Sequence, residues 1–374
     1  MNSTTWTRRQ FAQTLALGAA ATLTARSAAA FSPAEAHGIA VIGSGPDGDS
    51  EGALHVFRVT GKHWQLLQTE PAAAPAYLLQ HPTSQVLYAV HNVAEWNHLP
   101  CGAVSAYAVD RRSGKLTFWG TQPLSLAATN PSHAALTADG THLVVAAEGG
   151  GMYNLLPIAA DGGLLPVSSI RKELGLGDGE RFSTSAPRQV VMHPDGSLLT
   201  IDAGQESLTR FHLRDGDLAL QHRTHIHAGS GPTQLALGAG GMHVYTLSDS
   251  TGAIAVHPLR AGHLNPLEIY SAALGTKYLA AHPQGNFLLA GTDRSVAVLR
   301  MDRQSGRLTS HSQLGSMGSQ PVFSSDGGHL FGLDLSTGTV RLASFQAESG
   351  EAGVPATVAR VDNARSLLFL SATA

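Results

Sequence analysis

The chain has 374 residues, a formal net charge of −3 at pH 7 and only 14% charged residues. A composition so close to neutral excludes the strongly basic surface that binds nucleic acids or anionic membranes, so we expect neither partner. Cys101 is the single cysteine, which excludes an internal disulfide and a zinc site built from cysteines.

The first thirty residues have the organisation of an export signal. Two consecutive arginines precede Phe11, an alanine-rich apolar run follows, and Ala28–Ala30 are small residues of the kind found at cleavage sites. The arginine pair resembles a twin-arginine signal, with an ordinary secretory signal as the alternative. We predict a cleaved signal over residues 1–30, one domain over residues 31–374, a periplasmic or secreted location and no membrane insertion after cleavage.

A glycine-rich acidic segment, GPDGDSEG, covers residues 45–52. It places Asp47, Asp49 and Glu51 at alternate positions, and such a loop offers the oxygen ligands that calcium prefers. The segment lacks the twelve-residue EF-hand spacing, so a solvated acidic turn is the better interpretation. We therefore predict no cofactor and no metal site, with a divalent cation near Asp47 and Asp49 as the alternative.

Tight turns recur along the rest of the chain at intervals of 42 to 56 residues. Their first residues are Thr83, Asp139, Asp195, Gly240, Gln284 and Asp326. Each turn is followed by an apolar run of strand length, such as VLYAV or SLLTID, and then by an alternating run such as AVSAYAV or LTRFHL. Strand pairs separated by turns at such intervals are the pattern of propeller blades.

The two ends of the chain complete this pattern. An earlier alternating run, ALHVFRV, covers residues 53–59 and brings the number of copies to seven. This first copy has no innermost strand, whereas the final segment ARSLLFLSATA is a spare apolar strand, and pairing the two would close the ring and cover an open sheet edge. We predict an all-β fold, one closed ring of seven four-stranded blades. The alternative, a helical solenoid, is excluded because no apolar period of 3.6 residues continues for ten residues in the mature chain.

The ends of the inner strands predict a site. In such a blade the innermost strand starts at the face to which the second strand returns, so polar residues at both ends converge around the channel mouth. The predicted binding residues are His91, Gln189, Thr233, Gln234, Tyr77, Lys277 and Tyr278. The second strands end near carboxylates, among them Glu148, Asp202 and Asp249. Facing cations and carboxylates are typical of a polar ligand site, and a merely water-filled channel is the alternative.

Other motifs point less clearly to chemistry. His222, His225 and His227 lie close together, but they fall on an expected outer strand and are interpreted as solvated rather than zinc-bound. No Gly-x-Ser-x-Gly elbow occurs, so a serine hydrolase of the α/β type has no support. Trp96 and Cys101 lie in a long loop at the expected mouth, where an insertion can serve as a lid or a substrate wall.

Taken together, the repeats resemble a known family. The segments HPTSQVLYAV, YAVDRRSGKL, NPSHAALTADGTHLVVA, HPDGSLLTIDAGQESLTRFHL and GSGPTQLALGAGGMHVYTLSD are similar to those of the seven-bladed lactonases related to 6-phosphogluconolactonase and to the fungal carboxymuconate-lactonising enzyme. Three motifs depart from the family pattern. Arg188 stands where the family has the second histidine of His-x-His, Thr233 and Gln234 replace Arg-His, and Asp249 replaces a glutamate.

The resemblance implies the opening of a lactone ring, which needs a base to activate water and donors for the oxyanion. We expect Arg188 to bind an anionic group of the ligand, Asp249 to act as the base, and His133 to assist with His91. The expected ligand is a small anionic, carbohydrate-type molecule, bound by a monomer. The alternative is a non-catalytic ligand-binding or scaffold propeller that has lost lactonase activity, because the family's arginine and histidines are absent from their own positions.

Overall fold

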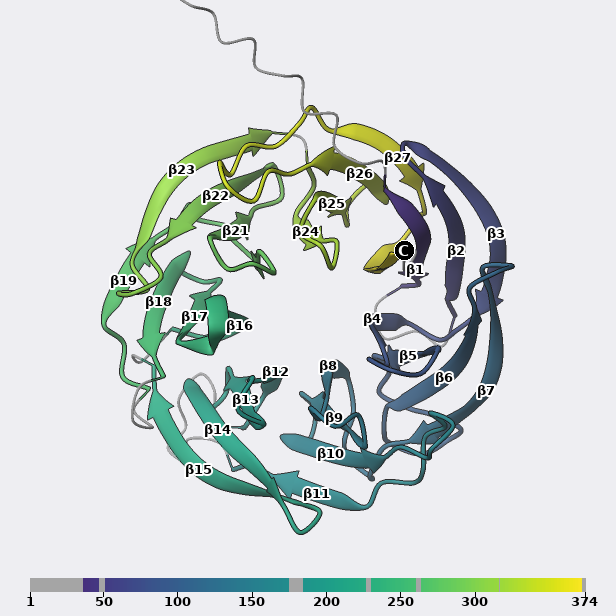
Figure 1. Ribbon diagram of the computed structural model, residues 1–374. Coiled ribbons are helices and arrows are strands. Elements are labelled where there is room, and N and C mark those ends of the chain that lie inside the picture. The colour runs from purple at the N-terminus through teal and green to yellow at the C-terminus, as the bar shows by residue number, and fades with distance from the viewer. Residues whose placement is uncertain are drawn as a thin grey trace, which may run out of the picture. The chain divides into compact units, whose positions relative to one another are not determined.

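The computed structural model describes residues 36–46, 51–174, 184–226, 230–259, 264–315 and 317–371. The chain divides into two units, Met1–Ala34 and Glu35–Ala374. The predicted signal over residues 1–30 lies outside the described residues, as do Asp47, Asp49 and His227. The second unit is a ring of seven four-stranded antiparallel sheets (Figure 1), which confirms the predicted fold class.

The strands follow one another from the channel outward in every blade except the first, whose innermost strand comes from the end of the chain. Blade 1 contains β28 (Ala364–Ser371), β1 (His37–Ser44), β2 (Ala53–Thr60) and β3 (His63–Pro71); blade 2 contains β4 (Pro75–Gln80), β5 (Val86–His91), β6 (Ala103–Asp110) and β7 (Lys115–Pro123). Blade 3 contains β8 (Pro131–Leu136), β9 (His142–Ala147), β10 (Met152–Pro157) and β11 (Ser169–Lys172); blade 4 contains β12 (Pro187–Met192), β13 (Ser197–Asp202), β14 (Ser207–Arg214) and β15 (Asp217–His225).

The last three blades repeat this order. Blade 5 contains β16 (Pro232–Leu237), the 3₁₀ turn η1 (Ala239–Gly241), β17 (His243–Ser248), β18 (Ala253–Pro258) and β19 (Glu268–Ser271). Blade 6 contains β20 (Tyr278–Ala281), β21 (Phe287–Gly291), β22 (Ser295–Met301) and β23 (Leu308–Gly315); blade 7 contains β24 (Gln320–Phe323), β25 (His329–Asp334), β26 (Thr339–Ser344) and β27 (Ala356–Arg360). Figure 1 shows β4, β8, β12, β16 and β24 around the channel and β3, β7, β15 and β23 on the outside.

The ring is closed by the predicted pairing of the chain ends. β28 runs antiparallel to β1, with Gly38 opposite Ser371 and Ser44 opposite Ala364. Blade 1 therefore takes its innermost strand from the C-terminal end and its other three strands from the N-terminal end of the described chain. This arrangement covers the edge of β1, which would otherwise present unpaired backbone groups.

The core lies between the blades. Seven clusters of buried apolar side chains are present in the described chain, one at each contact between neighbouring blades. In β5, Tyr88 and Val90 pack toward blade 3, whereas Leu87 and Ala89 pack toward blade 1. Because alternate side chains of a strand point to opposite faces, a second strand between two neighbours must be apolar on both faces. This explains the uninterrupted apolar runs of the sequence.

Three histidines at the turns between first and second strands bond to the neighbouring blade. These bonds join the ring nitrogen Nε2 and a backbone carbonyl in the pairs His81–Gly140 (3.0 Å), His193–Gly241 (2.9 Å) and His282–Gly327 (3.1 Å). In His81 the other nitrogen, Nδ1, accepts the backbone N–H of Ser84 at 3.0 Å. The proton of the neutral ring is therefore on Nε2, which donates to Gly140. Blades 2, 4 and 6 are each tied in this way to the blade that follows.

The structure also locates two of the three clustered histidines. His222 and His225 lie on β15, the outermost strand of blade 4, as expected. No helix in the described part of the chain has the length and hydropathy needed to cross a membrane.

Candidate functional site

The head of the innermost strand is built in the same way in four consecutive blades. Proline opens β4, β8, β12 and β16, a position at which the missing N–H is tolerated because the ladder only begins there. The register against the second strand then skips one residue, so each strand pair contains a bulge. The bulged residues are Ala76, Ser132, Arg188 and Thr233. A bulge takes its residue out of the ladder and redirects the side chain, and all four residues line one cavity.

This channel cavity has a volume of about 550 Å³ and is lined by residues of all seven blades. The predicted site residues that line it are Tyr77, His133, Arg188, Gln189, Thr233, Gln234, Asp249, Lys277 and Tyr278. The structure therefore brings together residues that lie up to about 200 positions apart in the sequence. The three residues to which the sequence analysis assigned catalytic roles, His133, Arg188 and Asp249, are among them.

Arg188 already has an acidic partner. Its Nη1 lies 2.7 Å from Oε2 of Glu148, which follows β9 in blade 3, and the two side chains are 36% and 35% exposed. Its backbone carbonyl accepts the hydroxyl of Ser132 at 2.8 Å. The sequence analysis named Glu148 at the end of a second strand but gave it no role, and the ion pair means that Arg188 is not a free anion clamp.

His133 is held between Tyr77 and Gln189. The rings of Tyr77 and His133 are 3.8 Å apart between centroids, and Gln189 Nε2 lies 3.4 Å from His133 Nε2. Because the amide oxygen of Gln189 accepts the backbone N–H of Leu235 at 2.6 Å, its NH₂ group faces His133. The neutral imidazole then carries its proton on Nδ1. Burial lowers the pKa of His133 to about 3 and raises that of Tyr77 to about 12, so both are neutral at pH 7.

Four buried polar atoms around the channel cavity have no hydrogen-bond partner in the part of the chain that the structure describes. They are His133 Nδ1, Arg188 Nε, Thr233 Oγ1 and Gln320 Oε1. Buried polar atoms are normally hydrogen-bonded, so a group of such atoms calls for an explanation. The residues that carry these atoms all line the channel cavity, while the atoms themselves are closed off from solvent.

Asp249 and Lys277 differ in their electrostatic surroundings. Asp249 follows β17, is exposed, and makes no hydrogen bond or ion pair with another described residue. Lys277 Nζ lies 2.9 Å from Asp293 Oδ2, and both side chains are at least half exposed. Asp249 is therefore the carboxylate of the channel cavity that can accept a proton from a bound water molecule, whereas the charge of Lys277 is largely compensated.

Sequence reasoning missed the two polar residues that blade 1 contributes to the channel cavity. Arg365 and Ser366 open β28, and the hydroxyl of Ser366 donates to the backbone carbonyl of Pro75 at 2.7 Å. The Nε group of Arg365 donates to the carbonyl of Gly45. The signal was present, because the segment ARSLLFLSATA was recognised as the missing innermost strand. Arg365, the second residue of this segment, thus occupies in β28 the place that Arg188 has in β12.

His91 lies apart from the channel cavity. Its Nδ1 is 2.5 Å from the carbonyl of Ala73, its Nε2 is 2.6 Å from Ser105 Oγ, and its ring stacks on Trp96 at 5.1 Å. These residues border a different cavity, of about 620 Å³. Burial lowers the pKa of His91 to about 4. Both ring nitrogens are bonded within blade 2, so we leave His91 out of the candidate site.

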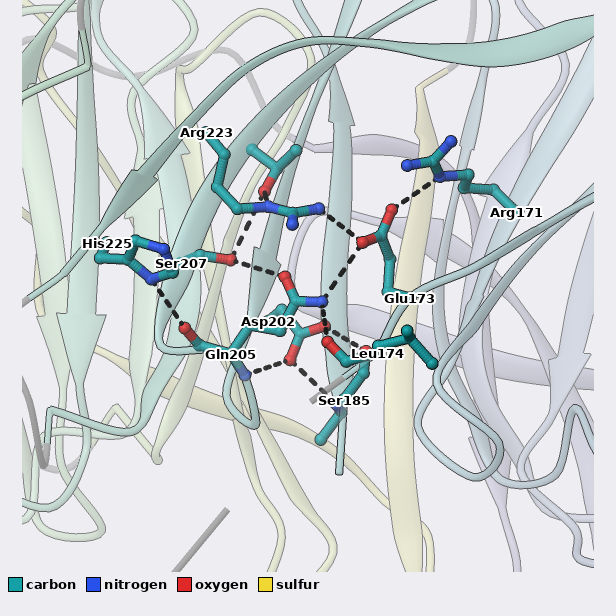
Figure 2. A network of polar contacts seen from close by, with 11 residues as sticks. Arg171, Glu173, Leu174, Ser185, Asp202, Gln205, Ser207, Arg223 and His225 are labelled. Atoms are coloured by element: carbon teal, nitrogen blue, oxygen red, sulfur yellow. Dashed lines mark hydrogen bonds and ion pairs between the residues drawn. The ribbon is translucent and has the colours of Figure 1, made fainter. Parts of the chain in front are cut away.

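Asp202, also expected at the mouth, is instead part of a buried polar network between blades 3 and 4 (Figure 2). Its carboxylate accepts the hydroxyl of Ser185 and the backbone N–H of Ala186 (2.9 Å), which immediately precede β12. In the same network, Glu173 is bonded to Arg171 at 2.7 Å and to Arg223 at 2.5 Å. The network fixes the start of the strand that carries Arg188.

Metal binding receives no support from the described residues. Among them, no three His, Cys, Asp or Glu side chains are grouped so that they could hold a metal ion. The alternative cation site near Asp47 and Asp49 lies outside the described residues. Cys101 is buried in the apolar cluster between blades 2 and 3, where it contributes to packing.

Comparison with known proteins agrees with this geometry. The family described as "Lactonase, 7-bladed beta-propeller" matches residues 39–369. A 6-phosphogluconolactonase of Bacillus subtilis is 25% identical over 332 residues, 83% of this chain and 92% of the relative. Among solved structures, the periplasmic gluconolactonase of Pseudomonas aeruginosa has a TM-score of 0.77 at 24% identity, with 89% of this chain and 99% of that chain covered. A protein from Lactobacillus plantarum has a TM-score of 0.75 at 19% identity, with 90% and 100% covered.

Proposed function

This chain belongs to the seven-bladed β-propeller lactonase family, and from this premise we propose that it hydrolyses a small sugar or organic-acid lactone in the channel cavity. The observation that carries the proposal is the grouping of Arg188, Asp249 and His133 in one cavity of about 550 Å³, a volume suited to a small molecule. The names of the two relatives, a 6-phosphogluconolactonase and a gluconolactonase, support a sugar lactone as the substrate class.

In the proposed reaction, water attacks the carbonyl carbon of the lactone. Asp249 accepts a proton from the attacking water, and the carbonyl oxygen becomes the oxyanion of a tetrahedral intermediate. The bond between that carbon and the ring oxygen then breaks, the ring oxygen takes up the proton that Asp249 accepted and becomes a hydroxyl, and the product is a hydroxy acid. Asp249 suits the role of base because no described residue neutralises it or occupies its oxygens.

Arg188 and His133 suit the role of donors to the oxyanion. Both residues line the channel cavity, where Arg188 brings a guanidinium and His133 brings an imidazole that is neutral at pH 7. Donors that are already oriented stabilise developing negative charge without reorganisation, and each contributes a factor of about 100 to 1,000 in kcat. The ion pair with Glu148 holds the guanidinium of Arg188 in place, and the tilted ring contact with Tyr77 holds the imidazole of His133.

The second candidate function is ligand binding without chemistry. The observation that favours it is the pairing of Arg188 with Glu148, because an arginine that serves only to organise the blade contact would look the same. Thr233 and Gln234 likewise offer hydrogen bonds but no charge. This candidate predicts binding of sugar acids or lactones without turnover.

We also propose that the mature protein acts outside the cytoplasm. The signal-like sequence over residues 1–30 supports this location, and so does the description of the Pseudomonas aeruginosa relative as periplasmic.

The test of the proposed function is ring opening of a panel of aldonolactones by the purified mature chain, measured as acid release above the spontaneous rate. We expect turnover by the wild-type protein, and a loss of about 100-fold or more in kcat for both Asp249→Asn and Arg188→Ala. Arg360→Ala, an exposed arginine of β27, is the matched control and should retain the wild-type rate. Wild-type turnover in both site variants would refute the assignment.

A further inference from the structure

Glu148 is held in a constrained position beside Arg188, and it lines a neighbouring cavity of about 590 Å³ rather than the channel cavity itself. It begins the segment EGGG, in which Gly150 and Gly151 have positive φ angles of 77° and 62°. The backbone N–H of Gly149 donates to the carbonyl of Thr129 at 2.9 Å, and a Cβ on Gly149 would collide with the side chain of Thr129. The backbone under Glu148 therefore packs closely against the preceding segment, and its carboxylate meets Arg188 from the neighbouring blade.

The charges around the channel cavity are closely balanced. Its described lining includes three cations, Arg188, Lys277 and Arg365, and one anion, Asp249. Each cation has an oxygen partner, which is Glu148 for Arg188, Asp293 for Lys277 and a backbone carbonyl for Arg365. Glu148 and Asp293 therefore offset the charges of Arg188 and Lys277, whereas Arg365 donates to a neutral carbonyl and keeps its positive charge.

The Glu148–Arg188 pair affects charged and uncharged ligands differently. An anion that approaches the guanidinium also approaches the Glu148 carboxylate, and their repulsion offsets part of the attraction. A carbonyl or hydroxyl oxygen has no net charge to be repelled, and it can still accept from the guanidinium of Arg188, which pairs with Glu148 through Nη1. The pair thus keeps the donor geometry of arginine and lowers its preference for ligands that carry a full negative charge.

We propose that Glu148 determines the specificity of the channel cavity for uncharged over anionic ligands. This inference deepens the proposed function and rests on it for the lactone class of the ligand. It revises the anionic ligand expected from the sequence, because Arg188 was then considered without its partner.

The experiment measures binding without turnover. Two probes, the open-chain anion gluconate and the uncharged cyclic analogue glucono-1,5-lactam, are titrated calorimetrically into the full mature chain at low ionic strength, and each probe is compared between wild type and variant. The variant is Glu148→Gln, which keeps the size and an acceptor for Arg188. The matched control is Asp362→Asn, which makes the same change in net charge at an exposed ion pair of blade 7.

We expect Glu148→Gln to bind gluconate about tenfold more tightly than the wild type, with the lactam affinity within about twofold, and Asp362→Asn to change neither. An unchanged or weaker gluconate affinity in Glu148→Gln, an equal gain in the control, or no binding of either probe would overturn the proposal. The expected binding pattern without hydrolysis of any lactone would support the role of Glu148 and refute only the proposed catalysis.

Discussion

Gln189 connects three blades through a single side chain. From β12 in blade 4, its amide group faces His133 in blade 3 and accepts the backbone N–H of Leu235 in blade 5. Substitution by alanine would leave that N–H without a partner and release the orientation of His133. We expect Gln189→Ala to lower the free energy of unfolding by about 1–3 kcal/mol, measured by urea denaturation.

Gln234→Ala is the matched control, because Gln234 has the same place in the next blade and no side-chain hydrogen bond among those found in the described chain. We expect its effect to stay below about 0.5 kcal/mol. Equal losses in the two variants would mean that the amide of Gln189 contributes packing and not the bonds described above.

Most positions of the candidate site could be predicted from the sequence, because they recur at a fixed distance before each turn. The repeat places Tyr77, His133 and Gln189 at equivalent positions, with Arg188 directly before Gln189, and equivalent positions in a ring must converge. The partners of these residues could not be predicted in the same way. The Arg188–Glu148 pair depends on the distance between two blades, and His91 is removed from the channel cavity by its bonds to Ala73 and Ser105, which no repeat pattern indicates.

At the scale of elements, the contacts between turn histidines and the neighbouring blade lead to a prediction about stability. Gly140 and Gly196 both occupy a tight turn with positive φ, 70° and 86°, but only Gly140 faces a histidine of the preceding blade. A Cβ on Gly140 would lie 2.8 Å from Nε2 of His81, whereas one on Gly196 would meet nothing within 4 Å. Both alanine variants should lose about 1 kcal/mol from the unfavourable φ, and Gly140→Ala should lose about 1–3 kcal/mol more from the collision.

The difference between the two variants should vanish in a His81→Ala background, because the colliding ring is then absent. Thermal or urea unfolding of the two single variants and the two double variants makes the comparison. A difference that persists without His81 would contradict the proposed contact between blades 2 and 3.

The strands themselves were predictable for a physical reason. A second strand such as β5 or β13 is buried on both faces, so it appears in the sequence as an uninterrupted apolar run. Outer strands such as β11 are half exposed and short, and their alternating pattern is weaker evidence. The histidine bonds between turns were not foreseen, because His81 and Gly140 are 59 residues apart and look like ordinary turn residues.

At the scale of the whole molecule, the account depends on closure of the ring by β28. Deletion of residues 364–374 would expose the edge of β1 and remove Leu367 and Phe369 from the core between blades 7 and 1. We expect this truncated chain to lose its cooperative thermal transition and to aggregate, because an open strand edge recruits other chains. A chain that ends at Ser371 is the control and should unfold as the full mature chain does. A monomeric truncated chain with an unchanged transition would contradict the role of β28.

The central claim is that the closed ring gathers a base and two donors into one cavity that opens a lactone. It is tested most directly by the initial rate of glucono-1,5-lactone ring opening in the wild type and in Asp249→Asn, with lactam binding measured on the same samples. The account predicts a kcat at least about 100-fold lower in the variant, with lactam affinity retained. A wild-type protein no faster than buffer, or a variant as fast as the wild type, would contradict it.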